Sequence, residues 1–340
     1  GHLTAAVQLG YNTGTLVYAV LSVADRYPPA RVFCICALLG AAFNLAVVWE
    51  GNTLNHLLMW RFCTGFFLAG IYPVGMKIAA DYYAAGLGKS LGYLVGALVV
   101  GTAFPHLLKD LSGSFSWKLV LVLTSGLAVF GGFLMLFLVQ DGPYRKASQQ
   151  LQWTALFQVF QKPPFRAAAY GYFGHMWELY SFWAFVPLLL QWYADAHPEV
   201  AFNVPLLSFV IIGVGGLACV LAGQLAARYT ARRVAAFALG LSGGCCLLAP
   251  WVLEGGAAPV FVGFLIFWGM VVVADSPLFS TLVAQNAPLA LKGTALTIVS
   301  LQMLNALRHW TDSKLILMVL ALGPVLGLLA LRRDRPTPSI

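Results

Sequence analysis

Apolar runs long enough to span a lipid bilayer recur along nearly the whole chain. A helix needs roughly 17–25 apolar residues to cross the hydrocarbon core. Eleven such runs lie near 4–23, 33–49, 54–77, 88–107, 118–139, 166–191, 204–226, 233–253, 258–283, 291–307 and 313–331. In lipid every backbone polar group needs an internal partner, and the runs lack the alternation of barrel strands. The sequence therefore predicts an all-α integral membrane protein.

The composition excludes most soluble classes of protein. Hydrophobic residues make up 60% of the chain and charged residues only 9%, whereas about a quarter of a soluble domain is charged. The net charge is +8, but the basic residues lie between apolar runs, so we assign them to membrane loops rather than to a nucleic-acid surface. The six cysteines lack paired Cys-x-x-Cys spacing, and we predict neither a metal site nor a cofactor.

The distribution of lysine and arginine predicts the orientation in the membrane. If the loop at 24–32 faces the cytoplasm, fifteen of the twenty basic residues fall on that side, four fall on the other, and Arg61 lies within a run. This asymmetry fits the positive-inside rule and places the C-terminus on the cytoplasmic side of the membrane. We expect that membrane to be a bacterial inner membrane. The first run then starts outside, so we expect one further helix before it, which would give twelve.

A polar connection divides the runs into two groups. We predict an N-terminal helix bundle at 1–139, a cytoplasmic linker at 140–165 and a C-terminal helix bundle at 166–340. Within the linker, apolar residues follow helical spacing at Leu151, Ala155, Leu156, Val159 and Phe160. This pattern favours an amphipathic helix on the membrane surface, with a plain linker as the alternative.

Two pairs of segments resemble each other at half-chain spacing. "LSVADRYPPARV" at 21–32 and "GQLAARYTARRV" at 223–234 share five residues at an offset of 202. At an offset of 204, "AGIYP", which ends at Pro73, is similar to "VADSP", which ends at Pro277. Two similar halves in one membrane chain are typical of transporters with internal symmetry.

The first pair of segments resembles the loop signature of the major facilitator superfamily, Gly-x-x-x-Asp-Arg/Lys-x-Gly-x-Arg/Lys-Arg/Lys. The two copies together keep Asp25, Arg26, Arg31, Gly223, Arg228, Arg232 and Arg233. Leu21 and Pro28 replace the glycines of the first copy, and Ala227 replaces the acid of the second. The resemblance implies two pseudo-symmetric six-helix bundles, and the blocks "AGIYPVGMK", "HMWELY" and "ADSPLFS" resemble uncharacterised bacterial permeases of this superfamily.

The resemblance also bears on function. Arg61 matches an arginine that the family often has in helix four, whereas the Gly-Pro of the antiporter signature is missing from helix five. We predict that the seven signature residues form a conformational latch, in which Asp25 pairs with a helix end or a neighbouring arginine. Arg26 and Arg31 could also bind lipid phosphates, and simple topology anchoring is the alternative.

Ionisable residues inside apolar runs are candidates for function. Arg61 lies well inside its run, and Lys77 follows the breaker "YPVG", whose Tyr72 we group with the substrate residues. Arg61 and Lys77 favour an anionic or zwitterionic substrate, although Lys77 could instead snorkel. Asp275, close to Pro277, is either a proton-coupling residue or a cap for the segment after it.

The stretch "GYFGHMWELYSFWAF" at 171–185 carries His175 and Glu178 on one predicted helix face. A charge facing lipid at mid-depth costs about 2.5–3.5 kcal/mol, so this face is expected to look into the bundle. Glu178 could carry a coupling proton with His175 as a relay, or the pair could be a static polar staple between helices. Aromatic walls for a substrate are expected from Trp177, Tyr180 and Trp183.

These features favour a secondary active transporter over an enzyme. Two bundles rocking about a central cavity would move a small anionic or zwitterionic solute by alternating access, coupled to protons. We expect a monomer whose partners are a small-molecule substrate, protons and membrane lipids, and no nucleic acid. Two alternatives stay open: an integral-membrane enzyme acting on a lipid-linked substrate, and a non-transporting membrane receptor. Symport, antiport and uniport also stay open.

Overall fold

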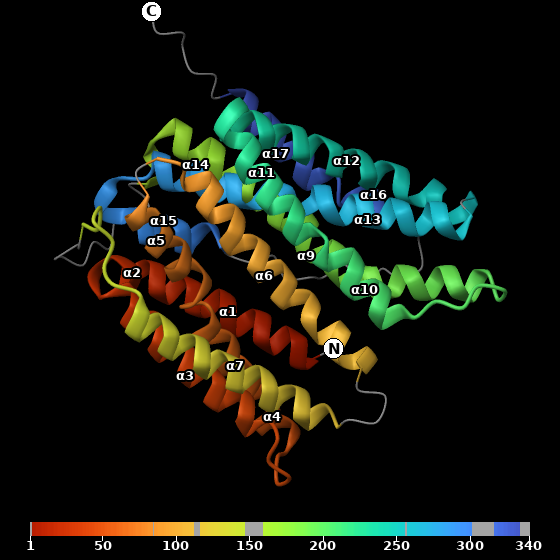
Figure 1. Cartoon of the computed structure of the whole chain (residues 1–340), viewed down its shortest axis with the longest axis horizontal. Helices are drawn as coiled ribbons and strands as arrows, with labels where there is room; N and C mark the ends of the chain where they lie inside the picture. Colours follow the sequence, from red (N-terminus) through yellow and green to blue (C-terminus); the bar gives the residue numbers. More distant parts are fainter. Residues whose placement is uncertain are drawn as a thin grey trace, which may run out of the picture. The chain divides into compact units, whose positions relative to one another are not determined.

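The structure is a computed structural model that describes residues 2–83, 85–111, 116–146, 159–255, 257–300 and 316–333. Within these ranges every regular element is a helix (Figure 1). The helices before the linker are α1 (His2–Val20), α2 (Val23–Arg26), α3 (Pro29–Ala46), α4 (Leu54–Leu68), α5 (Tyr72–Tyr82), α6 (Leu87–Leu111) and α7 (Trp117–Leu138). Those after it are α9 (Pro163–Ala196), α10 (Val204–Gly213), α11 (Gly215–Tyr229), α12 (Ala231–Gly255), α13 (Ala258–Ala274), α14 (Ser276–Asn286), η1 (Leu289–Leu291), α15 (Lys292–Val299), α16 (Ile316–Val319) and α17 (Leu322–Arg333).

Seven helical stretches of the described chain are long and apolar enough to cross a membrane. They are Pro29–Ala46, Leu54–Tyr82, Leu87–Leu111, Trp117–Leu138, Val204–Tyr229, Ala231–Gly255 and Ala258–Asn286. Each coincides with one of the predicted runs, and the other four runs fall on α1, α9, α15 and α16–α17. Residues 301–315 of the last two runs lie outside the described residues, as does 147–158 of the predicted amphipathic helix.

Two of the apolar helices break at corresponding places. α4 gives way to α5 just before Pro73, and α13 gives way to α14 just before Pro277. Proline lacks a backbone N–H and fits the first turn of a helix, so each helix restarts there. These breaks coincide with the sequence echo "AGIYP" and "VADSP", which shows that the echo reflects local backbone structure.

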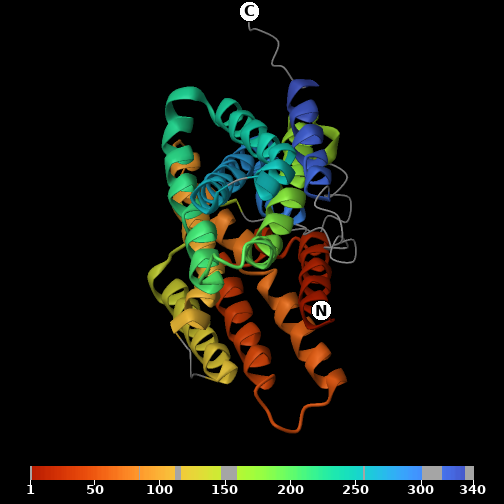
Figure 2. The same ribbon diagram turned by 90° about the vertical axis from the view of Figure 1, so that its right-hand side faces the viewer.

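One compact unit consists of Gly1–Leu87, Ser114–Phe165 and Val283–Leu304. Within it, α3 packs against α4 and α7, and α1 packs against α4 (Figures 1 and 2). α15 packs against α1, α2 and α5, although it lies far away in sequence. Gly10 and Gly65 allow the close approach of α1 and α4, because a Cβ at either would collide with the facing backbone.

The second compact unit consists of Gly88–Gly113, Arg166–Leu282 and Asn305–Ile340. Within it, α12 packs against α11, α13 and α17, and α11 also packs against α13. Gly92 and Gly96 bring α6 against the backbone of α11 at Cys219 and Gly216. The predicted bundle boundaries at 139 and 166 stay a prediction.

Candidate functional site

Glu178 lies on α9 and is buried among neutral hydrogen-bond donors of the second unit. It accepts from the Ser242 hydroxyl at 2.8 Å and the Cys246 thiol at 3.2 Å, both on α12. It also accepts from the Trp268 indole N–H on α13 at 3.0 Å. In the described chain no cation forms an ion pair with Glu178. A carboxylate that is held in a membrane helix by neutral donors alone is a candidate to carry a proton.

His175, nearly one turn before Glu178 on α9, contacts Asp275 instead. Its Nδ1 atom lies 2.8 Å from Oδ1 of Asp275, within ion-pair distance but outside hydrogen-bond geometry. Both side chains are buried, and Asp275 stands at the break between α13 and α14. His175 Nε2 has no hydrogen-bond partner among the described residues. Buried polar atoms are usually hydrogen-bonded, so His175 Nε2 is an exception among the described residues and stays a candidate for a role in proton transfer.

The small residues beside this cluster bring helices close together. Gly171 faces the ring of Phe279, and Gly174 faces the backbone of Gly323 on α17. A Cβ at Gly174 would collide with the Gly323 carbonyl. Close approach of helices through glycine is a general device of membrane proteins, and here it encloses the face of α9 that carries His175.

The predicted aromatic residues are half-buried and lie on α9 and α5. Tyr180 and Trp183 pack edge to face with ring centroids 5.5 Å apart. The indole nitrogens of Trp177 and Trp183 are buried and have no hydrogen-bond partner in the described ranges. Tyr72 starts α5 and is partly exposed.

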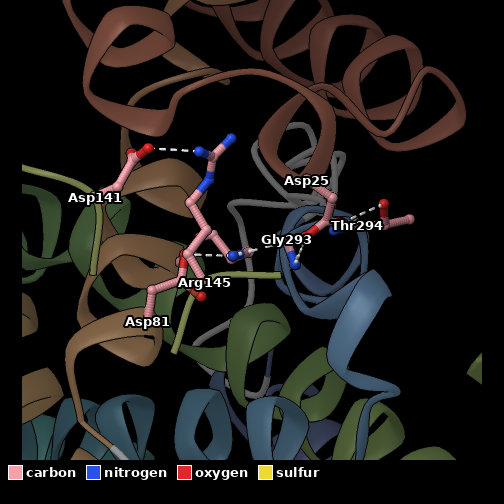
Figure 3. Close-up of polar contacts among 7 residues, drawn as sticks. Asp25, Asp81, Asp141, Arg145, Gly293 and Thr294 are labelled. Carbon is pink, nitrogen blue, oxygen red and sulfur yellow. Dashed lines mark hydrogen bonds and ion pairs between the residues drawn. The ribbon is translucent and has the colours of Figure 1, made fainter. Parts of the chain in front are cut away.

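Asp25, in the first unit, caps the start of α15. Its carboxylate accepts from the Gly293 N–H at 2.8 Å, the Thr294 N–H at 2.7 Å and the Thr294 hydroxyl at 2.9 Å. Figure 3 shows the carboxylate directed at both residues. Burial raises the pKa of Asp25 above its usual value, although Lys77 and these hydrogen bonds oppose the shift. A carboxylate at a helix N-terminus satisfies free N–H groups and complements the helix dipole.

Lys77 lies in the same cluster as Asp25. Its ammonium forms an ion pair with Asp81, one turn further along α5, and lies 4.0 Å from Asp25 Oδ1. All three side chains are buried. The single ammonium attracts both carboxylates, so Lys77 links α5 to the residue that caps α15.

The beginning of the linker docks on the same end of α5. The Tyr144 N–H donates to the Asp81 carbonyl at 3.0 Å, and the Tyr82 hydroxyl donates to the Gln140 carbonyl at 2.7 Å. Arg145 forms an ion pair with Asp141 at 2.5 Å (Figure 3). The Asp25 cluster and the first linker residues therefore both contact the end of α5 at Asp81.

Arg61 on α4 is half-buried and donates to Asn44 Oδ1 on α3 at 2.9 Å. The Asn44 amide in turn donates to the Ser125 hydroxyl on α7 at 2.9 Å. Among the described residues no carboxylate forms an ion pair with Arg61. A guanidinium in a membrane helix without a counterion has unused capacity to bind an anion.

The comparison with known families accounts for this combination of features. The family model of the Major Facilitator Superfamily matches residues 1–306. The chain belongs to the Major Facilitator Superfamily. This confirms the predicted family and the predicted all-α membrane fold. Because the superfamily consists of transporters, membership favours a transporter over an enzyme.

Solved structures of other members of the Major Facilitator Superfamily share the fold. The fucose:proton symporter FucP of E. coli is 14% identical and matches with a TM-score of 0.69, over 99% of this chain and 91% of that chain. The human organic anion transporter MFSD10 (TETRAN) is 17% identical and matches with a TM-score of 0.68, over 97% of this chain and 83% of that chain. No curated protein sequence matches the chain.

The remaining residues of the superfamily signature have different surroundings. Arg26 is half-buried with its guanidinium 5.7 Å from the ring centre of Tyr27, and Arg31 is exposed. Gly223 lets α11 approach the backbone of Gly88 on α6. Arg228 and Arg233 are exposed, and Arg232 donates to the Leu331 carbonyl at the end of α17.

Several partner residues were not predicted from the sequence. They are Asn44, Asp81, Ser242, Cys246, Trp268, Gly293 and Thr294. Two signals could have found some of them. Asp81 stands four residues after Lys77, the spacing of a helical ion pair. The offset of 202 residues in the superfamily signature also relates Asn44 to Cys246, and each bonds to a candidate ionisable residue.

The described residues contain no group of three or more His, Cys, Asp or Glu side chains that could hold a metal ion. Within the second unit, His175, Glu178 and Asp275 can each bind or release a proton, and within the first unit the Arg61 guanidinium can pair with an anion.

Proposed function

We propose that the chain is a secondary active transporter that moves a small anionic or zwitterionic solute by alternating access and couples this movement to protons. The observation that carries the proposal is the buried Glu178, which is held by three neutral donors inside a membrane helix bundle. Such a carboxylate, which has only neutral donors around it, can change between a charged and a neutral form.

The neighbouring His175 and Asp275 support a proton path. His175 lies on the same face of α9 as Glu178, and its contact with Asp275 becomes a full ion pair when the imidazole is protonated. A proton arriving at this group would therefore change the attraction between α9 and the break at α13–α14. This is a local event that a conformational change could follow.

Arg61 supports an anionic or zwitterionic substrate, since it has no counterion in the described chain. Trp177, Tyr180, Trp183 and Tyr72 stay candidates for a substrate wall. We assign Lys77 to the latch with Asp25 and Asp81, because its ammonium already has both carboxylates beside it. In the latch, release of α15 from Asp25 would accompany the change of state.

The named relatives make both parts of the proposal reasonable. FucP is described as a fucose:proton symporter and MFSD10 as an organic anion transporter. These descriptions concern those proteins, and at 14% and 17% identity they support only the comparison of folds. We further propose a monomer in a bacterial inner membrane, surrounded by lipid, with its C-terminus in the cytoplasm.

Transport by reconstituted protein tests the proposal. A thermal-shift screen of carboxylates, amino acids and sugar acids selects a solute, whose uptake into proteoliposomes is then measured with and without an inward proton gradient. We expect the gradient to drive accumulation. Glu178→Gln should lose accumulation but keep solute exchange at equal concentrations, because the amide preserves the shape of the site. Glu199→Gln, at an exposed glutamate of the same unit, is the matched control.

Two outcomes would contradict the proposal in different ways. Gradient-driven accumulation by Glu178→Gln at the rate of the unmodified protein would exclude Glu178 as the proton carrier. Binding of a solute without flux in either direction would exclude transport and favour a receptor, whereas chemical conversion of a lipid-linked substrate would favour an enzyme.

A further inference from the structure

A groove opens on the second unit between the start of α12 and the end of α17. Its volume is about 940 Å³, and it is lined by Thr230, Arg232, Arg233, Ala236, Phe237, Leu328, Leu331 and Arg332. None of these residues belongs to the Glu178 cluster or to the Asp25 cluster. The groove therefore needs an explanation separate from the transport site.

The lining has one cationic and one apolar part. Three arginines and the Thr230 hydroxyl supply hydrogen-bond donors, and none of the lining residues is acidic. Further along both helices, Ala236 and Phe237 on α12 face the groove together with Leu328 on α17. A ligand that matches both parts has an anionic head and an apolar tail.

The three arginines have different roles. Arg232 donates to the Leu331 carbonyl and so ties α12 to the last turn of α17. Arg233 and Arg332 are exposed, and both line the groove. Arg232 therefore ties the two walls of the groove together, and Arg233 and Arg332 bring a guanidinium group to it from each of the two helices.

The apolar part of the groove is open to the surroundings of the protein. Phe237 is 69% exposed, although it follows the charged start of α12 by only one turn. In a chain that crosses a membrane, this position is expected at the boundary between headgroups and acyl chains, where positive residues attract anionic lipids.

We propose that this groove binds an anionic glycerophospholipid. The phosphate lies against Arg233 and Arg332, and an acyl chain runs along Phe237 and Leu328. Lipid is favoured over a soluble phosphate compound because half of the lining is apolar and Phe237 has no other cover in the described chain. The site shares no residue with the Glu178 cluster or the Asp25 cluster, although Arg232 and Arg233 also belong to the superfamily signature.

Lipid titration of the full-length, delipidated protein tests this assignment. Native mass spectrometry in detergent measures the binding of phosphatidylglycerol and, for comparison, phosphatidylcholine. The double variant Arg233→Gln/Arg332→Gln should bind phosphatidylglycerol about 25-fold more weakly, at about fivefold for each arginine removed. Arg228→Gln, at an exposed arginine outside the groove, is the matched control and should bind normally.

A second variant distinguishes binding of a whole lipid from binding of a phosphate group alone. Phe237→Ala should weaken the binding of phosphatidylglycerol several-fold but leave any binding of inorganic phosphate, followed by thermal shift, unchanged. Equal binding of phosphatidylglycerol by the double variant and the Arg228→Gln control would overturn the site. Tight binding of inorganic phosphate, with phosphatidylglycerol binding unaffected by Phe237→Ala, would overturn the lipid as its occupant.

Discussion

The Asp25 carboxylate accepts the backbone N–H of Thr294 at 2.7 Å, although 269 positions separate the two residues in the sequence. The neighbouring Gly293 N–H donates to the same carboxylate at 2.8 Å. These bonds satisfy N–H groups that a helix leaves free in its first turn. A side chain near the start of the chain therefore satisfies the first turn of α15.

We expect Asp25→Asn to loosen the first turns of α15. The amide keeps the shape of the side chain but replaces one accepting oxygen with an NH₂ group, so the bond from Gly293 or the bonds from Thr294 are lost, which weakens the cap by about 1 kcal/mol. Amide hydrogen exchange over 292–299 should then be about fivefold faster, as measured by mass spectrometry. Glu50→Gln, at an exposed carboxylate of the same unit, should leave this exchange unchanged. Unaltered exchange in Asp25→Asn would refute the cap as a latch.

The raised pKa of Asp25 also makes the stability of the fold depend on pH. Because burial raises the pKa of Asp25 above 3.8, the folded chain binds its proton more readily than the unfolded chain. The contribution of this group to the free energy of unfolding therefore decreases as pH rises from about 4 towards the folded pKa. Asp25→Asn cannot titrate, so its melting temperature should vary less with pH across this window. Thermal unfolding in detergent at several pH values measures both slopes, and equal slopes would contradict the prediction.

The contact between His175 and Asp275 should be energetically coupled. Removing one partner of a buried charged pair leaves the other unpaired, at a loss of about 3 kcal/mol or more. We expect His175→Ala and Asp275→Ala each to lower stability by such an amount, and the double variant to lose less than the sum. Denaturation in mixed detergents completes this double-mutant cycle. A coupling energy below about 0.5 kcal/mol would mean that the contact does not stabilise the fold.

The close approach of α9 and α17 depends on the absence of a side chain at position 174. We expect Gly174→Ala to destabilise the protein by about 1–3 kcal/mol, because the new methyl group would collide with the Gly323 carbonyl. Gly240→Ala, on α12, is the matched control, since its Cβ would meet no atom within 4 Å. That change should be neutral or stabilise by up to about 1 kcal/mol. Equal unfolding midpoints for both variants would contradict the close packing.

Local properties of the chain determined the class of the protein. Apolar length predicted the membrane helices, and the prolines at 73 and 277 marked the places where two of them restart. The two loop segments indicated the superfamily through their residues and their half-chain spacing. The hydropathy of a run and the missing N–H of proline act on the backbone within a few residues. Both effects can therefore be predicted from the sequence alone.

The partners of the charged residues were decided only by the tertiary structure. His175 and Glu178 are three positions apart, yet one contacts Asp275 and the other contacts Ser242, Cys246 and Trp268. Lys77, a predicted substrate residue, lies between Asp25 and Asp81. A hydrogen bond or ion pair requires a separation of a few ångströms. For His175 and Glu178, helix packing sets that separation across 64 to 100 positions of the chain, and no local pattern in the sequence encodes it.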